Sequence, residues 1–505
     1  STATGASYFA TRKDTDAIEM EHDGVEFSLE SLTLREKLAQ LMVGSPYDSR
    51  TGYMVDNAFA KLPLPENFTD WLSDWLKTDE ITGGVHIFNS DARSLDEANR
   101  TIVELLSRSK IPPLVSMDVV GGYTRHLGLS LEEAQKFGVP NRFIKLAKAE
   151  NLALPTQESI GRQFSALKTV KERIQFRKDL EAYGAAVANL CKYIGVSVDF
   201  APVLDMVKDI DGENFMDKND QSYGENAYTV QILGFHFMKG FQSVDGVIVA
   251  PKHFFGTGKS PNDPHKDEDQ QVTGTEVSDG TVLPFKDAVT GRLFYDRIVK
   301  RYKHDIDSFD FHLRRHLISI KRAKLSGDDE ELGRLRNAYK IFLKKYGFTV
   351  EDIPEDFMEM PRVAAMMVSH SQNFTNQEEP GTISSEMVRR RLKQKLGFRG
   401  LAVSDDLNMG ATERYVAHRM SDSEDWPAEA FALALASGVT MPMLLHHSGE
   451  IDAIVKRVKS AIDTHEDFDG DGNPDITVAT VDAAVRQVLG EKVRLGLLQE
   501  RIDSE

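Results

Sequence analysis

Asp263 and His265, two positions apart, are a pair of residues whose types could do chemistry together. The carboxylate of the aspartate could orient and charge the imidazole of the histidine. Because a histidine has an ordinary pKa near 6.5, it gives and takes protons close to neutrality. An Asp-x-His sequence in a loop rich in Pro and Asn is also common turn chemistry, so the spacing by itself leaves both interpretations open.

This pair follows a stretch in which a predicted strand ends in polar groups. Residues 246–250 form a short apolar run, which predicts a strand buried on both faces. Lys252 and His253 come where that strand would end. Gly256 and Gly258 then allow the backbone to turn sharply and to approach a ligand closely. A Lys-His pair in such a place can also be solvated or structural.

Other predicted strands end in the same way. Further apolar runs lie at residues 41–43, 84–88, 114–117, 196–201, 364–368, 401–403 and 440–445. Helical patterns separate the runs, and about eight repeats predict an α/β fold, a (β/α)₈ TIM-like barrel with helical insertions. We expect residues 1–505 to form this single catalytic domain, with the polar residues 1–30 as an irregular outer arm. Active sites of such barrels lie at the carboxyl ends of the strands, where Asp118, His370 and Asp405 also fall.

The composition limits the classes of partner. With 41% hydrophobic and 28% charged residues, the chain is typical of a soluble globular protein. A net charge of −18 disfavours nucleic acid and anionic membranes, because both require a basic face. No apolar run approaches the roughly 20 residues of a membrane helix. Cys191 is the only cysteine, so an intrachain disulfide is impossible.

Several motifs together resemble glycoside hydrolase family 3. KHFFGTG followed by DPH resembles that family's K-H-F-P-G-x-G … D-S-H signature, and SDDLNMGA resembles its S-D-D-L-x-M motif. VSMDVVGGYTR, VDFAPVLD and DQSYGEN follow the family's order as well. The D-x-H dyad resembles the β-N-acetylglucosaminidase subgroup, in which it takes the place of a glutamic acid. The resemblance covers roughly residues 34–498.

The resemblance implies a role for each polar group. Retaining cleavage of a glycoside needs a carboxylate nucleophile and a proton donor. The resemblance assigns these roles to Asp405 and to His265, and makes Asp263 the partner that orients His265. It also implies five residues that bind the sugar: Asp118, Lys252, His253, Gln221 and His370. For His370 a buried structural role is an equally good interpretation.

Four positions depart from the family pattern. Phe255 replaces the usual Pro and Pro264 the usual small residue, both within the loop that carries the dyad. Val120 replaces a Glu. Gln221 stands where the family has an Arg, so that a neutral amide takes the place of a bidentate charged clamp. These departures bear on the substrate and its affinity more than on the chemistry.

The leading hypothesis is a retaining exo-β-N-acetylglucosaminidase that acts on short oligosaccharides derived from chitin or peptidoglycan. It needs no cofactor for catalysis, has a small oligosaccharide as its partner, and is a monomer or homodimer. A β-N-acetylglucosaminide phosphorylase with the same site, or a catalytically impaired sugar-binding protein, are the alternatives. A cytoplasmic and an extracytoplasmic location both stay open.

An aspartate-rich stretch near the end of the chain has the spacing of a calcium loop. Asp467, Asp469, Asp471 and Asp475 occupy positions 1, 3, 5 and 9 of that pattern. Val478 stands at position 12, where a calcium loop of this type has its bidentate Glu. A structural Ca²⁺ site and a plain surface turn are both consistent with the sequence.

Two insertions exceed the minimal barrel of the family. Residues of about 131–175 follow the third strand on the catalytic face and could wall the sugar site. Residues of about 292–360 are helical and heavily charged, and we expect them to hang from the opposite face. A solvated helical hairpin is favoured over a partner-binding arm.

Overall fold

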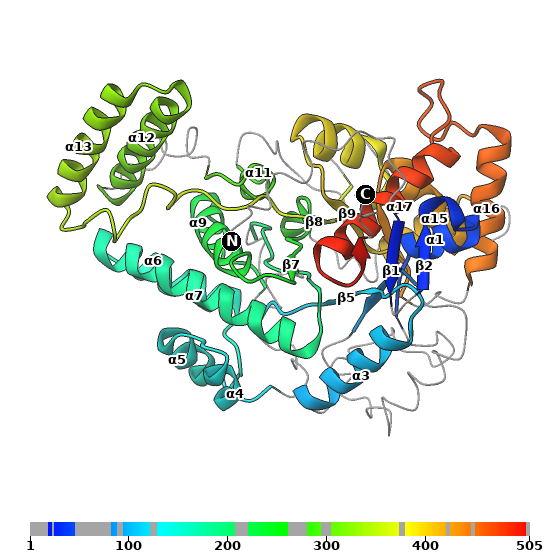
Figure 1. Ribbon diagram of the computed structural model, residues 1–505, viewed down its shortest axis with the longest axis horizontal. Helices are drawn as coiled ribbons and strands as arrows, with labels where there is room; N and C mark the ends of the chain where they lie inside the picture. Colours follow the sequence, from blue (N-terminus) through cyan, green and yellow to red (C-terminus); the bar gives the residue numbers. More distant parts are fainter. Residues whose placement is uncertain are drawn as a thin grey trace, which may run out of the picture.

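Eight parallel strands form the centre of the molecule (Figure 1). The computed structural model describes residues 19–22, 25–45, 82–87, 94–121, 129–207, 221–260, 280–293, 305–372, 379–420, 425–445 and 450–500. The strands follow the order β7-β6-β5-β4-β3-β10-β9-β8. Bridges from Val203 to Lys252 and from Phe254 to Val368 continue the pairing beyond β7, and the second of them joins the two outer strands. The predicted (β/α)₈ TIM-like barrel is therefore confirmed.

The strands are short and lie where the apolar runs predicted them. Their bounds are β3 (Val43–Gly44), β4 (Gly84–His86), β5 (Leu114–Met117), β6 (Val198–Asp199), β7 (Ile248–Val249), β8 (Ala365–Val368), β9 (Leu401–Asp406) and β10 (Met441–Met443). The first strand begins two residues later than expected, because the preceding helix continues to Leu41. The barrel interior is lined by residues such as Val43, Phe200 and Val403 and contains a cavity of only about 10 Å³. That volume is at the lower limit for a single water molecule, so the barrel is a packed core.

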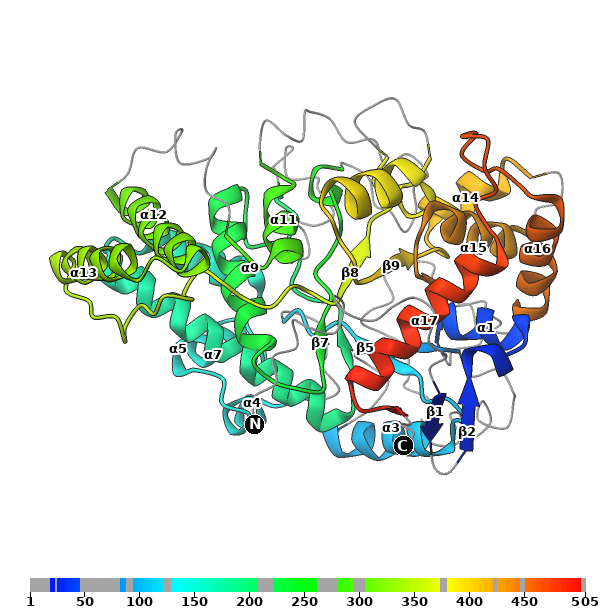
Figure 2. The same cartoon turned by 45° about the horizontal axis from the view of Figure 1, so that its top comes forward.

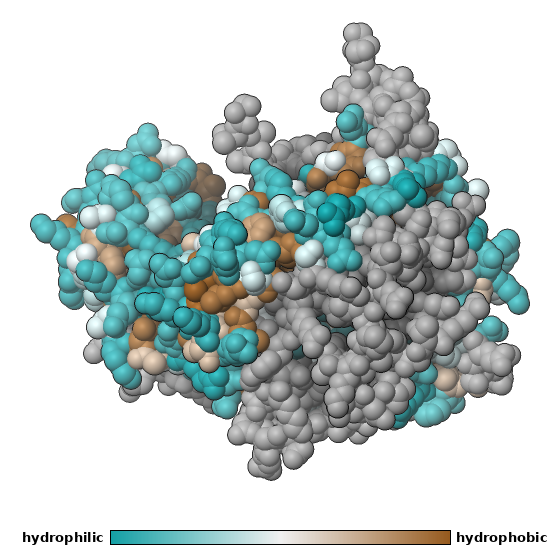
Figure 3. Space-filling model, turned by 90° about the horizontal axis from the view of Figure 1, so that it is seen from below, coloured by the Kyte–Doolittle hydropathy of each residue, from teal (hydrophilic) through white to brown (hydrophobic). Residues whose placement is uncertain are grey.

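Helices surround the barrel. The helices near the strands are α1 (Leu34–Leu41), α3 (Leu95–Arg108), α7 (Val170–Ile194), α9 (Ala227–Phe241), α11 (Leu283–Thr290), α14 (Gly410–Ala417), α15 (Trp426–Ser437), α16 (Ile451–Thr464) and α17 (Val478–Arg494), with a π-helix at Glu386–Lys395. Short 3₁₀ segments lie at Leu29–Ser31, Thr257–Lys259 and Gly381–Ile383. None of the helices in the described ranges has both the length and the apolar content needed to cross a bilayer. Seen from below, the described surface is mostly hydrophilic, with hydrophobic patches between the polar groups (Figure 3).

The first insertion consists of α4 (Leu131–Lys136), α5 (Asn141–Ala149), α6 (Gln157–Ala166) and the start of α7. A capping box begins it: Ser130 Oγ accepts a hydrogen bond from Glu133 N, and the Glu133 carboxylate accepts one from Ser130 N. Thr169 and Glu172 form a second capping box at the start of α7. These caps satisfy backbone N–H groups that the first turn of a helix leaves without a partner.

The expectation of an irregular arm over residues 1–30 is wrong for part of it. Strands β1 (Glu19–His22) and β2 (Val25–Ser28) form an antiparallel pair, and β1 also pairs with β11 (Gln499–Glu500). The two ends of the described chain thus share one small sheet. The run EMEHDGVEFS alternates polar and apolar residues around Asp-Gly, which is a hairpin pattern that could have been recognised.

The second insertion forms a helical hairpin of α12 (Asp305–Ser326) and α13 (Asp329–Lys345). It leaves the barrel beyond α11, where Arg292 and Glu359 form an antiparallel bridge at the end opposite the catalytic face. The hairpin packs against α7 and α9, because Asp310 on α12 pairs with Arg177 on α7 and accepts a hydrogen bond from Tyr228 on α9. Figures 1 and 2 both show it at one end of the longest axis, with α16 at the other end.

Candidate active site at the carboxyl end of the barrel

An ion pair joins the ends of two strands at the carboxyl end of the barrel. Asp118 directly follows β5, and Lys252 lies three residues beyond β7. The Nζ atom of Lys252 lies 2.6 Å from Oδ1 of Asp118. Enclosure by the protein opposes ionisation of Asp118, but the adjacent ammonium outweighs it and holds the pKa of Asp118 below its ordinary value. Asp118 is therefore an anion throughout the neutral range.

A second carboxylate holds the ring of His253. Oδ2 of Asp205 accepts two hydrogen bonds from this one residue, from the main-chain N and from Nδ1, each at 2.8 Å. Because a carboxylate only accepts, Nδ1 must carry the proton. The other ring nitrogen, Nε2, lies 4.0 Å from Oδ2 of Asp405. The imidazole of His253 therefore lies between two carboxylates that come from different strands.

Asp405 lies in the last part of β9 with its side chain 18% exposed. Burial disfavours its charge, but His253, His370 and Lys252 together hold the pKa of Asp405 below its ordinary value. The carboxylate is thus ionised, partly accessible and placed at the mouth of the barrel. These are the properties that a carboxylate nucleophile needs.

The neighbouring Asp406 is bonded to the protein backbone and has a structural role. Its side chain is buried, and Oδ1 accepts hydrogen bonds from the backbone N–H groups of Asn408 and Leu445. Alternation along β9 explains why the two aspartates differ, because successive side chains of a strand point to opposite faces. Asp406 therefore joins the ends of β9 and β10, whereas Asp405 is left for chemistry.

His370 lies below this layer and is buried. Its Nδ1 lies 2.9 Å from the hydroxyl of Thr382 and 2.8 Å from that of Thr412, and its Nε2 lies 3.0 Å from the carbonyl oxygen of Asp406. Both ring nitrogens thus have protein partners. This environment favours the structural interpretation of His370 over direct sugar binding.

Two further groups under the site received no role from the sequence. Asp199, at the end of β6, is fully buried and accepts a hydrogen bond from Val119 N at 2.8 Å. Burial raises the pKa of Asp199 to about 7. His86, at the end of β4, has Nε2 at 3.9 Å from Asp118, and burial lowers the pKa of His86. Asp199 and His86 end their strands, and Asp205 follows β6. The rule that identified Asp118 and Asp405, a polar residue at or after the end of a strand, could therefore have found all three.

Gly256 and Gly258, in the loop beyond β7, are required for different reasons. Gly256 has φ of +108°, a conformation that residues with a Cβ rarely adopt. Gly258 packs against protein: a Cβ there would lie 2.4 Å from the carbonyl oxygen of Met206 and 3.2 Å from Cβ of Asp205. Its small size therefore lets the loop pack onto the segment that carries Asp205, rather than letting it approach a ligand.

The positions that depart from the family pattern lie near this centre or outside the described ranges. Val120 is buried in the core, and Gln221 is half-buried next to Ser222, whose hydroxyl donates to the carbonyl oxygen of Asp205 at 2.7 Å. The predicted dyad of Asp263 and His265 falls in residues 261–279, which lie outside the described part of the chain.

The aspartate-rich loop is the other predicted site. Carboxylate oxygens of Asp467, Asp469 and Asp475 lie within 4.8 Å of one another, and Asp471 does not belong to that group. Oδ1 and Oδ2 of Asp467 accept hydrogen bonds from three backbone N–H groups of the same loop. Asp475 is buried and accepts two more such bonds and an ion pair from Arg389. The loop is thus held closed by its own backbone, and calcium binding stays a prediction.

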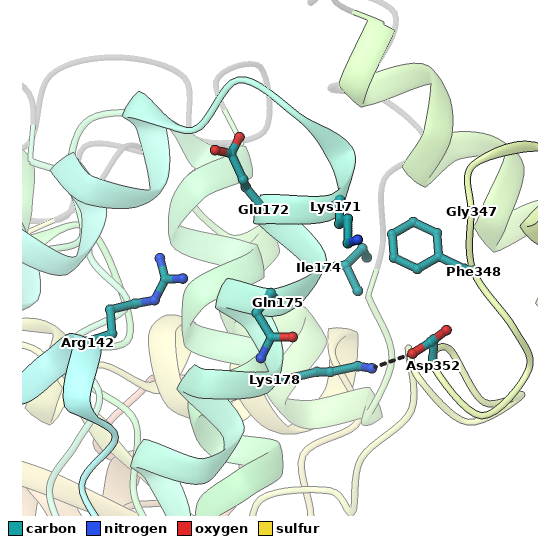
Figure 4. Close-up of a pocket in the computed structure, with 9 residues that line it drawn as sticks. All are labelled: Arg142, Lys171, Glu172, Ile174, Gln175, Lys178, Gly347, Phe348 and Asp352. Atoms are coloured by element: carbon teal, nitrogen blue, oxygen red, sulfur yellow. Dashed lines mark ion pairs between the residues drawn. The ribbon is translucent and has the colours of Figure 1, made fainter.

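A cavity of about 410 Å³ lies outside the barrel, between α7 and the segment that follows α13 (Figure 4). Arg142, Lys171 and Lys178 give it a cationic side, and Phe348 and Asp352 lie opposite them. Lys178 pairs with Asp352 at 3.6 Å and Arg142 pairs with Asp179 at 2.9 Å. None of the predicted catalytic or sugar-binding residues lines this cavity, so it is separate from the barrel end.

The solved structures that the chain resembles share this fold. A family 3 β-N-acetylglucosaminidase from Paenibacillus sp. str. FPU-7 has a TM-score of 0.56 at 18% identity, and the match covers 94% of this chain and 64% of that chain. A β-N-acetylhexosaminidase from Beutenbergia cavernae has a TM-score of 0.55 at 18% identity, covering 91% of this chain and 98% of that one.

Two curated relatives are similar in sequence. A beta-hexosaminidase of Thioalkalivibrio sulfidiphilus is 22% identical over 392 residues, which are 78% of this chain and 80% of the relative. A periplasmic beta-glucosidase of Salmonella typhimurium is 22% identical over 456 residues, which are 88% of this chain but only 41% of the relative. The chain thus spans most of the first relative and less than half of the second.

The family match extends over most of the barrel. The family described as "Glycosyl hydrolase family 3 N terminal domain" matches residues 33–294 and 359–490. These ranges contain all eight barrel strands and the carboxylates at their ends. The chain belongs to glycosyl hydrolase family 3 and is a glycoside hydrolase.

Proposed function

We propose that the protein is a retaining exo-β-N-acetylglucosaminidase that releases terminal β-linked N-acetylglucosamine from short oligosaccharides. One observation carries the proposal: Asp405 is held as an anion at the mouth of the barrel by cationic groups from other strands. A retaining mechanism requires such a carboxylate on one side of the scissile bond and a proton donor on the other.

In the proposed mechanism, Asp405 attacks the anomeric carbon and forms a covalent glycosyl-enzyme. His265 protonates the departing oxygen, with Asp263 orienting its ring, and then takes the proton from the water that attacks the intermediate. Lys252 and Asp118 offer a donor and an acceptor beyond the ends of β7 and β5 and would bind sugar hydroxyls.

The amino sugar is the substrate that fits the D-x-H dyad, the feature by which this sequence resembles the glucosaminidase subgroup. The names of the Thioalkalivibrio relative and of the Paenibacillus and Beutenbergia structures support the same substrate class. The Salmonella relative is a β-glucosidase, so the glucoside is the competitor to be measured.

The decisive experiment compares kcat/KM for the 4-nitrophenyl β-glycosides of N-acetylglucosamine and glucose. We expect a preference for the acetamido sugar of about a hundredfold, because a site that bonds the acetamido group rejects the analogue that lacks it. Proton NMR of the first product should show the β-anomer before mutarotation. Equal rates on both glycosides, or an α-anomer as first product, would overturn the proposal.

Two control measurements separate the alternatives. Adding phosphate distinguishes hydrolysis from phosphorolysis, because a phosphorylase would release the sugar 1-phosphate. If no glycoside is turned over, calorimetry with N-acetylglucosamine distinguishes an impaired sugar-binding protein from one that does not recognise the sugar. Gln221→Arg tests the clamp position, because restoring a bidentate cation should lower KM if Gln221 lies against the sugar.

A further inference from the structure

The helical hairpin is additional to the family barrel. The family match stops at residue 294 and resumes at residue 359, so it omits all of α12 and α13. Glycoside cleavage at the barrel end does not need these helices. A role for the hairpin therefore has to be found in its own surface.

The hairpin is fixed rigidly to the barrel helices. Asp310 on α12 is buried against Arg177 on α7, with Nη1 of the guanidinium 2.8 Å from Oδ1 and Nη2 2.5 Å from Oδ2, and Tyr228 on α9 donates to the same carboxylate. On the other side, Lys321 pairs with Glu359 at 2.5 Å. A buried bidentate pair holds one geometry, so the outer face of α12 is presented in a fixed orientation.

That outer face carries an apolar ridge. Phe311, Ile318 and Leu325 follow one another at intervals of seven residues and are 36%, 36% and 79% exposed. Residues seven apart lie almost on one line along a helix, so this ridge is about 20 Å long. Of the seven large hydrophobic side chains most exposed in the described ranges, four belong to the hairpin, since Ile341 on α13 is the fourth. Such a concentration marks an interaction surface.

Cationic residues flank the ridge on both sides. With about 100° between successive residues, the order around this face is Lys321, Arg314, Leu325, Ile318, Phe311, Arg322, Arg315. The guanidinium of Arg315 also lies 5.9 Å from the ring centre of Phe311. An apolar strip between two rows of cations is the pattern of a helix that lies in the surface of an anionic bilayer.

The charge of the hairpin is opposite to that of the protein. Residues 305–345, from the start of α12 to the end of α13, contain ten Arg and Lys residues against seven Asp and Glu residues, whereas the whole chain carries −18. Four of the acidic residues are consecutive, from Asp328 to Glu331, at the start of α13 and therefore away from the ridge, and Asp310 is paired with Arg177. The exclusion of anionic membranes by net charge does not extend to this face, because charges farther than about 8 Å are screened in physiological salt.

We propose that the exposed face of α12 docks onto the surface of an anionic phospholipid bilayer. Phe311, Ile318 and Leu325 enter the interface, and Arg315 and Arg322 contact lipid phosphates. A second copy of the chain is a poorer occupant, because a symmetric contact of this face would bring the arginines of one copy toward those of the other. An acidic protein is also poorer, because one helix face is smaller than the roughly 800 Å² per partner of a stable interface.

The test is sedimentation of the full chain with vesicles of phosphatidylcholine and phosphatidylglycerol, and with vesicles of phosphatidylcholine alone. We expect binding to the mixed vesicles only, and its loss at high salt. The double variant Arg315→Gln/Arg322→Gln should lower the partition coefficient by about 30-fold, because two cations near the surface are removed. The triple variant Phe311→Ser/Ile318→Ser/Leu325→Ser should lower it by a similar or larger factor.

The matched control is Val103→Ser/Val478→Ser, which removes two other exposed apolar side chains, on α3 and α17. It should bind like the wild type. Thermal unfolding shows that each variant is folded, and a lower Tm is expected only for the triple variant, because Phe311 and Ile318 are 36% exposed and bury the rest of their surface. Wild-type protein that stays in the supernatant, hairpin variants that bind as well as the wild type, or binding only to an acidic protein would each overturn the proposal. The outcome does not depend on which glycoside the barrel cleaves.

Discussion

Two clusters of carboxylates were predicted from the sequence to be binding sites, and in the structure their side chains have different kinds of partner. At the carboxyl end of the barrel, Asp118 and Asp405 are balanced by Lys252 and His253, which come from other strands. In the loop around Asp467, the carboxylates accept hydrogen bonds from N–H groups of their own loop. Carboxylates paired across strands form a site that can act on a ligand, whereas carboxylates bonded to their own loop hold that loop.

The largest expected effect comes from removing one carboxylate from each cluster and comparing the activities. Asp405→Asn should lower kcat by about 10⁴-fold or more for every substrate, because a missing nucleophile has no substitute. Asp469→Asn, its counterpart in the loop, should leave kcat/KM unchanged. Steady-state kinetics on an activated aryl glycoside measure both, and thermal unfolding shows that each variant is folded. Substantial activity in Asp405→Asn would mean that the wrong carboxylate has been chosen.

A finer test concerns the charges that cross the barrel end. Asp205→Asn keeps the shape of the side chain but removes the negative charge behind His253, so kcat/KM should fall by about a hundredfold. Asp205 also fixes the ring of His253 near Asp405, so a ring released from that position should lower the pKa of Asp405 less, and this pKa should rise toward its ordinary value. The acidic limb of the pH profile should therefore move to higher pH. A uniform loss with an unmoved limb would indicate a purely structural role for Asp205.

Substitutions in the loop around Asp467 should change the stability of the protein rather than its activity. Arg389→Met removes the cation beside the buried Asp475, and we expect the free energy of unfolding to fall by about 1–3 kcal/mol. Two backbone hydrogen bonds to Asp475 remain and limit the loss. Urea unfolding measures this change, and kcat/KM should be that of the wild type. A parallel loss of activity would show that the two clusters are coupled.

Asp199 is a buried carboxylate at the barrel end that forms no ion pair in the described ranges, and its effect on stability should depend on pH. Burial raises the pKa of Asp199 to about 7, so the folded protein binds more protons than the unfolded chain between about pH 4 and 7. Stability contributed by this group is present below that window and is lost as the pH rises through it. Asp199→Asn should therefore gain about 1–3 kcal/mol at pH 8 and little at pH 4. The opposite pH trend would show that Asp199 is ionised in the folded protein.

Calcium is expected to have the smallest effect. Weak binding at Asp467, Asp469 and Asp475 should raise Tm by about 1 °C at millimolar Ca²⁺, and Asp467→Asn should abolish the shift. An unchanged Tm in the wild type would leave the loop as a backbone-bonded turn.

The sequence predicted the barrel well because its signals are local. Each apolar run and the polar residue after it, such as Met117 with Asp118, can be read within one window. The partners at the site could not be read in this way. Asp205 bonds His253 across 48 positions of chain, and the backbone bridge between Val203 and Lys252 and the close packing at Gly258 bring the two segments together.

The difference between local and distant signals also applies to the predictions for the calcium loop and for the second insertion. Residue types at calcium spacing do not show whether the oxygens are already bonded to backbone N–H groups, as those of Asp467 are. The charged segment of residues 292–360 was expected on the opposite face because of its place in the chain. Its contact with α7 depends on Arg177 and Asp310, which are 133 positions apart and carry no shared local pattern.

The two ends of the hairpin insertion meet at the bridge between Arg292 and Glu359, so the barrel could be rejoined there by a short turn without moving α11 or β8. Such a deletion would not be neutral, because it would uncover the surface of α7 and α9 that α12 now covers and would remove the carboxylate that pairs with Arg177. Arg177 itself could remain, since its guanidinium would then be open to water, whereas apolar side chains uncovered beside it would need polar replacements. The insertion is thus connected to the barrel at one point but packed against two barrel helices, and recombination between relatives with and without it should succeed only when that surface of α7 and α9 is exchanged together with the hairpin.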